Sequence, residues 1–313
     1  MPASEQDFLD QIDSHFPGRS PGIVLGRGDD CAIMDVSGPI CLSTDLFVEH
    51  QHFRRSYFSP GDIGHKALAA AASDLAAMGA APVGFALSLM ISEADDDVFL
   101  DGLLAGMAEL SRQLGIPLVG GDLSRGPALA LDITVLGRPG PSGRLLKRAQ
   151  AKSGDTLVVI GPVGLARAGL HALEARGREA LSQWPAATGA HLRPLPRLAE
   201  GLALAAIPEV RGLMDVSDGL ARDLPRFLGD YGCDLSLKPE GLHPEVRAFF
   251  GESAVEEALL GGEDYALLAA APFGASGILE TIPGVQTIGV VTQAPGLRLN
   301  GQPFSKAGFD HFG

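Results

Sequence analysis

The sequence is poor in cysteine and in basic residues, and it has no long uninterrupted apolar run. Its three cysteines, Cys31, Cys41 and Cys233, are too few and too scattered for a disulfide framework or a CxxC metal site, so a reducing cytoplasm is the compartment that fits best. The 24 Lys and Arg residues are outnumbered by 38 Asp and Glu residues, which gives a formal net charge of −14. Because nucleic acids and anionic membranes both bind basic surfaces, this charge predicts neither as a partner.

Several familiar motifs are also missing. The most apolar stretch, residues 67–91, is interrupted by Asp74 and Pro82 and is not expected to span a bilayer. The N-terminus is polar and acidic, and it predicts an amphipathic helix instead of a signal peptide. The chain contains neither a P-loop nor the glycine-rich loop, HRD and DFG set of protein kinases, and it lacks G-x-S-x-G and H-E-x-x-H. The sequence therefore does not match the motifs of P-loop proteins, protein kinases, G-x-S-x-G hydrolases or H-E-x-x-H metalloproteases.

What the chain does have is a globular composition, with 46% hydrophobic and 20% charged residues. Its 313 residues are enough for two domains, each with its own core. Strand and helix patterns are interspersed along the chain, which predicts an α/β fold of the α+β type. The segment 138–154 is rich in Pro, Gly and basic residues, and it predicts a boundary between an N-terminal domain, residues 1–138, and a C-terminal α/β domain, residues 139–313.

Local patterns predict the individual elements. Helices are expected over residues 61–79, 92–116, 196–206, 218–228 and 253–260, and apolar strands over residues 82–91, 117–123, 128–137, 155–161 and 264–271. Asp95, Asp96 and Asp97 fall at a helix start, where the helix dipole favours acids and no further role is needed. Residues 177–196 are expected to form a loosely ordered polar connection.

The most informative feature is a set of acidic residues in small or apolar surroundings. They are Asp29, Asp30, Asp45, Asp74, Asp122, Asp215, Asp218 and Glu263. A carboxylate in such a place must be paired or must bind a metal to offset its desolvation, and few basic side chains lie near these acids in the sequence. Mg²⁺ is the alternative partner, since it takes oxygen ligands and bridges one or two carboxylates to phosphate.

Each acid also has a structural interpretation. A single Asp after Gly is more commonly a turn or cap residue, whereas Asp74 lies among alanines in the middle of a predicted helix and has no such explanation. Ser43 and Thr44 add hydroxyl ligands beside Asp45, or cap a following turn. The glycines of GGDLSRG and GGED bring backbone close to phosphate, or form tight turns. Arg148 either binds a phosphate or is a solvated surface charge. His52, taken by itself, is more often a structural residue than a functional one.

Eight motifs, taken in order, resemble the thiamine-monophosphate kinase family, which belongs to the superfamily of aminoimidazole ribonucleotide synthetase and selenophosphate synthetase. They span nearly the whole chain. The motifs are GDDCAIMD (28–35), STDLFVEHQHF (43–53), KALAAAASDLAAMGAAP (66–82), GGDLSRGP (120–127), KRAQAKSGD (147–155), MDVSDGLARDL (214–224), GGEDYALL (261–268) and GFDHF (308–312).

The resemblance implies a phosphotransferase of thiamine diphosphate biosynthesis that moves the γ-phosphate of ATP to the phosphate of thiamine monophosphate. It implies two α/β domains, with the N-terminal domains pairing in a homodimer, and several Mg²⁺ ions that assist direct transfer without a catalytic side chain. The implied metal ligands are Asp30, Ser43, Thr44, Asp45, Asp74, Asp122, Asp215 and Asp218. The implied ATP contacts are Gly121, Asp122, Arg148 and Ser217, and the implied thiamine-monophosphate contacts are His52, Glu263 and Phe309.

The chain departs from the family pattern at Ala71, Leu123 and Ala266, where relatives commonly have an Asn-Leu pair before the helix Asp, a Thr and a Glu. None of these removes an implied metal carboxylate. A sibling enzyme of the superfamily is the nearest alternative, but residues 1–28 lack the cysteine expected of selenophosphate synthetase, and the chain ends Phe312-Gly313 instead of in the cysteine of the hydrogenase-maturation relative. A non-catalytic nucleotide-binding or scaffold protein is the alternative from another class.

Overall fold

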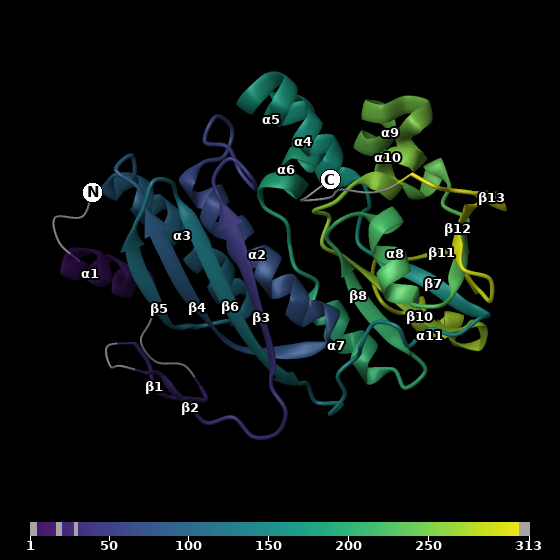
Figure 1. Cartoon of the computed structure of the whole chain (residues 1–313), viewed down its shortest axis with the longest axis horizontal. Coiled ribbons are helices and arrows are strands. Elements are labelled where there is room, and N and C mark those ends of the chain that lie inside the picture. The colour runs from purple at the N-terminus through teal and green to yellow at the C-terminus, as the bar shows by residue number, and fades with distance from the viewer. Residues whose placement is uncertain (1–4, 17–20, 28–30, 307–313) are drawn as a thin grey trace. The chain divides into compact units, whose positions relative to one another are not determined.

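The computed structural model describes residues 5–16, 21–27 and 31–306. Its chain divides into two compact units (Figure 1): one comprises Met1–Leu75 and Ala81–Arg138, and the other comprises Ala76–Ala80 and Pro139–Gly313. Strands and helices are interspersed in both units, which confirms the predicted α/β class. Among the helices of the described part, none is long and apolar enough to cross a membrane.

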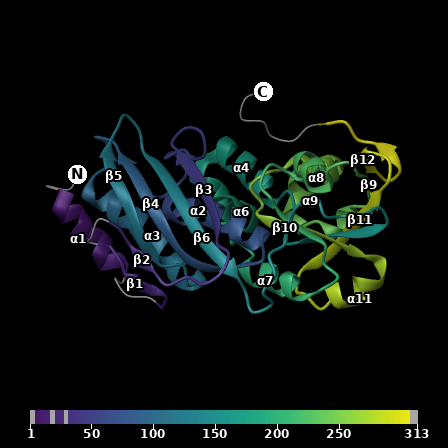
Figure 2. The ribbon, with the colours of Figure 1, turned by 60° about the horizontal axis from the view of Figure 1, so that its bottom comes forward.

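The N-terminal unit is built on a four-stranded sheet in the order β3-β6-β4-β5. Its strands are β3 (Cys41–Val48), β4 (Ala80–Ile91), β5 (Leu118–Arg125) and β6 (Ala130–Pro139). Strands β3 and β6 are antiparallel, and β4 and β5 are parallel. Two helices, α2 (Pro60–Ala77) and α3 (Asp97–Leu114), lie behind the sheet (Figure 1, Figure 2). Helix α1 (Glu5–His15) and the antiparallel pair β1 (Ile23–Leu25) and β2 (Ile33–Met34) complete the unit.

Helix α3 begins and ends where its capping residues place it. The Asp96 side chain accepts a hydrogen bond from the backbone N–H of Phe99 at 2.8 Å, which satisfies one of the open donors of the first turn. Gly115 ends the helix in the left-handed region, at φ 66°. Helices α2 and α3 approach closely, because a Cβ added to Gly106 would lie 2.1 Å from the carbonyl oxygen of Gly61.

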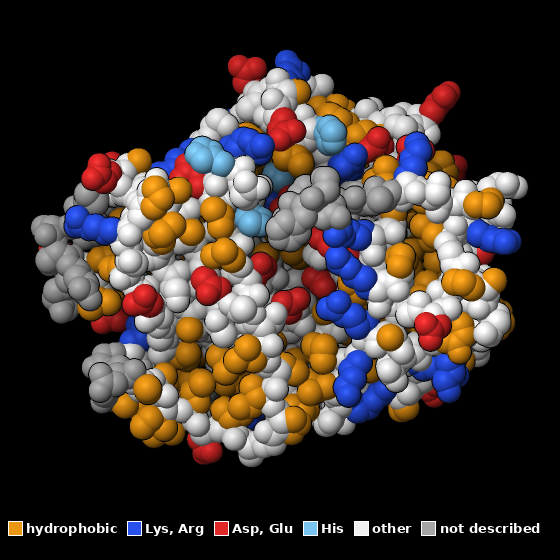
Figure 3. Space-filling model, in the orientation of Figure 1, with side chains coloured by type: hydrophobic (Ala, Val, Ile, Leu, Met, Phe, Trp, Pro, Cys, Tyr) orange, Lys and Arg blue, Asp and Glu red, His pale blue; other side chains and the backbone are white. Residues whose placement is uncertain are grey.

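The two faces of the sheet in the N-terminal unit differ in exposure. Side chains of a strand alternate between faces, and in β6 the residues Leu131, Ile133 and Val135 are fully buried. On the opposite face, Leu42 and Leu46 of β3 are 66% and 55% exposed. Figure 3 shows apolar side chains gathered on the lower part of this unit's visible face. The sheet therefore has one covered face and one open apolar face.

The C-terminal unit is built on a mixed seven-stranded sheet in the order β13-β12-β9-β11-β7-β10-β8. Its strands are β7 (Asp155–Ile160), β8 (Gly212–Val216), β9 (Gly232–Leu235), β10 (Ala266–Pro272), β11 (Val285–Thr292), β12 (Gly296–Leu299) and β13 (Gln302–Pro303). Strands β7 and β10 and the edge strand β8 are almost entirely buried, which agrees with their largely apolar sequences. They form one core with residues of the helices, including Leu220, Phe227 and Leu259.

The helices of the C-terminal unit include an element that the sequence did not predict. They are α4 (Leu165–Arg176), α5 (Ala180–Gln183), α6 (Pro185–Leu192), α7 (Leu198–Ala206), α8 (Leu220–Leu228), α9 (Pro244–Phe250), α10 (Ala254–Leu260) and α11 (Ser276–Leu279), with short 3₁₀ turns at Gly177–Glu179, Pro239–Gly241, Gly251–Ser253 and Phe273–Ala275. The predicted loose connection over residues 177–196 is wrong, because this stretch forms one of the 3₁₀ turns, α5 and α6. Ala180, Ala187 and Leu192 of this stretch are buried, and their packing holds the short helices in place.

The short segment Ala76–Ala80 packs within the C-terminal unit although in the chain it interrupts the N-terminal unit. The backbone N–H of Leu146 donates to the carbonyl oxygen of Met78 at 3.0 Å. A Cβ added to Gly201 of α7 would lie 2.3 Å from the carbonyl oxygen of Ala76, so only glycine allows this approach. The C-terminal unit is therefore assembled from two separate parts of the chain.

Candidate functional site

In the N-terminal unit, the predicted ligands Ser43 and Asp74 lie together. The Ser43 hydroxyl of β3 donates a short hydrogen bond to Oδ2 of Asp74 on α2. Ser43 and Asp45 point to the helix-covered face, because they pair with the buried residues Val135 and Ile133 of β6. A hydroxyl and carboxylates form an all-oxygen donor set of the kind that Mg²⁺ prefers, so these side chains fit that ion.

Thr44 and Asp122 lie on the opposite, open face of the same sheet. The Thr44 hydroxyl donates to Oδ1 of Asp132 at 2.6 Å. Asp122 of β5 is in register with Ser88 of β4, and both residues are exposed. Sequence reasoning treated Ser43, Thr44 and Asp45 as neighbours in one set, but alternation along a strand places Thr44 away from the other two. The structure therefore brings Ser43, Asp45 and Asp74 to one face and separates Thr44 and Asp122 from them.

Gly121, a predicted ATP contact, lies within β5 and not in a tight turn. A Cβ added there would lie 1.9 Å from the carbonyl oxygen of Leu87 on β4. The glycine is thus required by the pairing of two strands, and the turn interpretation of this motif is wrong at this position.

His52 follows β3 in a loop whose geometry fixes its imidazole. The backbone N–H of Val48 donates to Nδ1 of His52 at 3.0 Å, so the proton of the neutral ring is on Nε2. The ring stacks on Phe47, with centroids 5.5 Å apart and planes inclined by 29°. His52 can therefore present an N–H donor from a ring of set orientation.

An ion-pair network holds the same loop. Arg55 contacts both oxygens of Glu49, at 2.6 and 2.9 Å, and Oδ1 of Asp95 at 2.7 Å. The hydrogen bond from Arg55 lowers the pKa of Glu49 below its ordinary value. Asp95 is fully buried, and it accepts from the backbone N–H of Ser92 at 2.7 Å. Asp96, the cap, and Asp97, in the first turn of α3, fit the predicted role as helix-start acids, whereas Asp95 has a further partner in Arg55.

In the C-terminal unit, Asp215, Ser217 and Asp218 occupy the end of β8 and the turn into α8. Asp215 is buried and pairs with Leu267 of β10. Oδ2 of Asp218 lies 2.6 Å from Nη1 of Arg226 and 3.5 Å from Nε of Arg222. The premise that few basic groups lie near these acids is therefore wrong for Asp218. Arginines four and eight residues later on a predicted helix were the signal that could have shown it.

Asp223, which the sequence argument did not select, organises this turn. Its buried carboxylate accepts from the backbone N–H of Asp218 at 3.0 Å. Burial raises the pKa of Asp223 to about 6, against the lowering effect of the hydrogen bonds from Asp218 and Ser217. The Asp223 side chain of α8 therefore holds the backbone of the turn that carries Ser217.

Glu263 lies in a loop joined to the same turn. Its backbone N–H donates to the carbonyl oxygen of Ser217 at 2.7 Å, and its φ of 63° is in the left-handed region. A non-glycine residue held at such a φ stores strain of about 1–3 kcal/mol, and such residues cluster at functional sites. Oε2 of Glu263 lies 3.2 Å from Nδ1 of His191 on α6. The structure thus places a predicted ATP contact beside a predicted thiamine-monophosphate contact.

The neighbouring Asp264, also missed by the sequence argument, is a helix cap. Its carboxylate accepts from the backbone N–H of Gly164 at 2.5 Å and of Ala166 at 2.9 Å, at the start of α4. Burial raises the pKa of Asp264 to about 7, although these backbone hydrogen bonds lower it. Asp264 therefore anchors the Glu263 loop to α4.

Arg148 is exposed, and the backbone around it is fixed on both sides. The N–H of Ala149, whose φ is 57°, donates to the carbonyl oxygen of Phe227 at 2.8 Å. The carbonyl oxygen of Lys147 accepts from the N–H of Leu213 at 3.3 Å. Arg148 is therefore held between the start of β8 and the end of α8.

The Ala266 departure has a local consequence. A Cβ added to Gly161 would lie 3.3 Å from the Cβ of Ala266 and 3.2 Å from Nε of Arg197. That Nε is buried and has no hydrogen-bond partner among the described residues. Ala266 and Arg197 therefore lie on the same side of Gly161, and the methyl group of Ala266 offers no acceptor to this Nε.

Two predicted site residues, Asp30 and Phe309, lie outside the described residues. Within residues 5–16, 21–27 and 31–306, no group of three or more His, Cys, Asp and Glu side chains is arranged to hold a metal ion. Magnesium sites at phosphates need only one or two carboxylates, since phosphate oxygens and water supply the other ligands. The donor set of Ser43, Asp45 and Asp74 remains compatible with that type of site.

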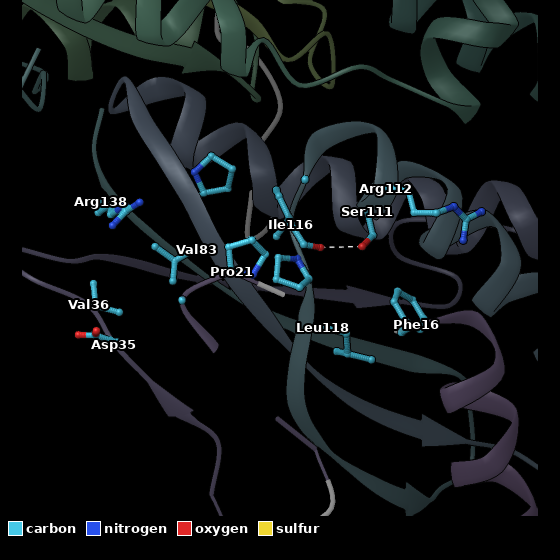
Figure 4. A pocket seen from close by; sticks show the side chains of 14 residues that line it. Phe16, Pro21, Asp35, Val36, Val83, Ser111, Arg112, Ile116, Leu118 and Arg138 are labelled. Atoms are coloured by element: carbon cyan, nitrogen blue, oxygen red, sulfur yellow. Dashed lines mark hydrogen bonds between the residues drawn. The ribbon is translucent and has the colours of Figure 1, made fainter. Parts of the chain in front are cut away.

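A cavity of about 520 Å³ in the N-terminal unit lies apart from these residues (Figure 4). Its wall includes Phe16, Val83 and Leu118, with Arg112 and Arg138 as basic groups. None of the predicted site residues that the structure describes is among its lining residues. This cavity is therefore not the predicted phosphate-transfer site.

Comparison with known proteins defines the class. Residues 28–138 match the N-terminal domain of AIR synthase related proteins, and residues 152–302 match the C-terminal domain of the same group. The chain is thus a two-domain AIR synthase related protein. Hydrogenase maturation protein HypE of Escherichia coli has this fold too, with a TM-score of 0.75 at 24% identity over 98% of each chain.

Several relatives with higher identity are thiamine-monophosphate kinases. The chain is 34% identical to thiamine-monophosphate kinase of Synechococcus elongatus, over 98% of this chain and 96% of the relative, and 36% identical to that of Salmonella typhimurium, over 93% and 92%. The crystal structure of the Stenotrophomonas maltophilia thiamine-monophosphate kinase superposes with a TM-score of 0.84 at 31% identity, over 95% and 96% of the two chains. The chain belongs to the thiamine-monophosphate kinase family.

Proposed function

We propose that this chain transfers the γ-phosphate of ATP to thiamine monophosphate, forming thiamine diphosphate and ADP in thiamine diphosphate biosynthesis. The observation that carries the proposal is family membership across both units, at 34–36% identity over more than nine-tenths of the chain. AaThiL, solved in complex with AMPPCP and TMP, superposes on this chain with a TM-score of 0.79 at 25% identity over 98% of this chain.

Each of the two units carries oxygen side chains that are proposed to bind Mg²⁺. In the N-terminal unit, Asp74, hydrogen-bonded by Ser43, and Asp45 on the same face would hold Mg²⁺. Thr44 and Asp122 on the open face, Asp215 and Asp218 in the C-terminal unit, and Asp30 stay predicted ligands. Bound Mg²⁺ would neutralise the negative charge that keeps two phosphate groups apart. That several Mg²⁺ ions bind is part of this proposal and rests on the resemblance.

The remaining assignments concern substrate binding. Arg148 and Ser217, with Gly121 and Asp122, are proposed to contact ATP, and His52, Glu263 and Phe309 to hold thiamine monophosphate. His52 can donate from Nε2, and Glu263 brings a negative charge that suits the cationic thiazolium. The acceptor phosphate monoester is largely ionised near neutral pH, so these residues position the reactants and no side chain need remove a proton.

The proposed homodimer pairs the N-terminal units. The open face of the sheet supports it, since Leu42 and Leu46 are more than half exposed and Val24, Ile33 and Ile40 nearby in the chain are also exposed. Exposed apolar surface of this kind marks interaction surfaces. A cytoplasmic location stays a prediction from the cysteine content.

The test is a phosphate-transfer assay with ATP, Mg²⁺ and thiamine monophosphate, and a parallel reaction with thiamine, with products separated by chromatography. We expect thiamine diphosphate from the monophosphate alone. ATP turnover without that product would indicate a sibling enzyme with another acceptor. Absence of turnover in a folded, Mg²⁺-loaded sample would favour a binding protein.

A further inference from the structure

A buried histidine contacts the proposed thiamine-monophosphate residue Glu263. His191 is 2% exposed, and its Nδ1 lies 3.2 Å from Oε2 of Glu263, whose side chain is 30% exposed. A neutral imidazole with its proton on Nδ1 donates to this oxygen without cancelling the carboxylate charge. The contact thus fixes one end of a side chain that reaches toward solvent.

The backbone of Glu263 is already fixed by its neighbours. Its N–H is bonded to Ser217, and the next residue, Asp264, caps α4 through Gly164 and Ala166. The freedom that remains lies in the flexible Glu263 side chain, which loses rotamer entropy when a ligand orders it. A partner that orders this side chain in advance reduces that loss.

Helix α6, which carries His191, is held equally firmly. A Cβ added to Gly169 of α4 would lie 2.0 Å from the carbonyl oxygen of Ala187, so the two helices are in backbone contact. The carboxylate of Glu245 accepts from the backbone N–H of Ala187 at 2.8 Å and of Ala186 at 3.2 Å, at the start of α6. His191 is therefore mounted on a rigid support.

We infer that His191 is a positioning residue that orients the Glu263 carboxylate for thiamine monophosphate. Helices α4 and α6 together then hold the Glu263 loop, α4 through Asp264 and α6 through His191. This inference rests on the proposed function, and it gives a role to α6, which lies in the stretch 177–196 that sequence reasoning interpreted as a connection.

The experiment compares His191→Leu, which keeps the volume and removes the donor, with His191→Asn, which keeps a donor near the position of Nδ1. We expect His191→Leu to raise KM for thiamine monophosphate roughly tenfold, the effect of one lost hydrogen bond to a charged group, with kcat and KM for ATP within about twofold. His191→Asn should restore most of the affinity. His171→Leu, at an exposed histidine of α4, is the matched control and should leave KM unchanged.

A double-mutant cycle with Glu263→Gln separates positioning from packing. In the Glu263→Gln background, His191→Leu should have little further effect on KM, because the group through which it acts is already changed. An unchanged KM in His191→Leu, or a full additional effect in the Glu263→Gln background, would overturn the inference. If His191→Leu does not fold by circular dichroism, His191→Gln takes its place with the same expected result, since its donor is displaced from Glu263.

Failure of the inference and failure of the proposed function look different. A wild-type chain that forms no thiamine diphosphate refutes the function, and the positioning role with it. A wild-type chain that forms the product while His191→Leu retains its KM refutes the positioning role alone.

Discussion

Among single residues, Asp74 carries the strongest prediction about activity. Replacing it with Asn removes the charge but keeps the shape and an oxygen for the Ser43 hydroxyl. We expect turnover to fall about a thousandfold or more, because a lost metal carboxylate removes several kcal/mol of charge stabilisation. Thiamine diphosphate formation over a range of Mg²⁺ concentrations measures this. Asp35→Asn, at an exposed acid of the same unit, is the control, and near-normal turnover of Asp74→Asn in a folded sample would contradict the metal role.

Because Asp264 is buried, its ionisation makes the free energy of unfolding depend on pH. Its pKa is raised by burial to about 7 in the folded chain, against an ordinary value of 3.8. Between about pH 4 and pH 7 the unfolded chain releases this proton while the folded chain keeps it, so stability relative to a non-titrating variant falls as pH rises. The fall is up to about 4 kcal/mol, at about 1.4 kcal/mol per pKa unit.

Asp264→Asn keeps an acceptor for the α4 backbone but cannot ionise. We therefore expect the difference in unfolding free energy between wild type and Asp264→Asn to shift in favour of the variant as pH rises from 4 to 7. Urea unfolding at several pH values measures it. A difference that is constant over this range would show that Asp264 is not buried as a neutral acid.

Sequence reasoning identified the acids of the site but not their partners. Motif resemblance selected Asp74, Asp218 and Glu263 by position. The ion pairs of Asp218 with Arg222 and Arg226 were overlooked, although the spacing of these arginines on a predicted helix was a signal for them. Sequence reasoning missed Asp223 and Asp264 because both act through backbone N–H groups, which carry no residue-specific signal.

At the level of elements, periodicity and caps were sufficient for the long helices. Helices α2 and α3 have alanine-rich or amphipathic sequences with clear ends, and both were predicted within a few residues. Helix α6 was not, since its eight residues carry too short a pattern and its burial comes from contact with α4. Short helices stabilised by tertiary contacts are outside the reach of local patterns.

The α4–α6 contact gives the prediction at this level. In Gly169→Ala the new methyl group would overlap the carbonyl oxygen of Ala187, so the two helices must move apart. We expect a loss of about 1–3 kcal/mol in unfolding free energy, the usual result of overpacking. Chemical denaturation measures it, with Gly189→Ala in α6, where a Cβ meets nothing within 4 Å and the backbone is helical, as a control for the glycine itself. Equal stability losses in the two variants would refute the close contact.

For the whole molecule, the open sheet face predicts the oligomeric state. A double variant, Leu42→Lys and Leu46→Lys, places two charges on the exposed apolar face of β3. If the N-terminal units pair through this face, burying these charges is unfavourable and the variant should be monomeric while the wild type is dimeric. Size-exclusion chromatography with light scattering decides this. A variant that stays dimeric would place the interface elsewhere.

The chain enters its C-terminal unit twice, first at Ala76–Ala80 and again at Pro139. A C-terminal fragment that begins at Pro139 would lack the backbone carbonyl groups of Met78 and Ala76 that face Leu146 and Gly201. That fragment would expose the surface that the five residues 76–80 cover in the whole chain. Split versions of this protein should therefore reassemble more readily when the 76–80 peptide is supplied with the C-terminal piece, and ribosomal synthesis delivers this peptide before Leu146 and α7, which contact it, have been made.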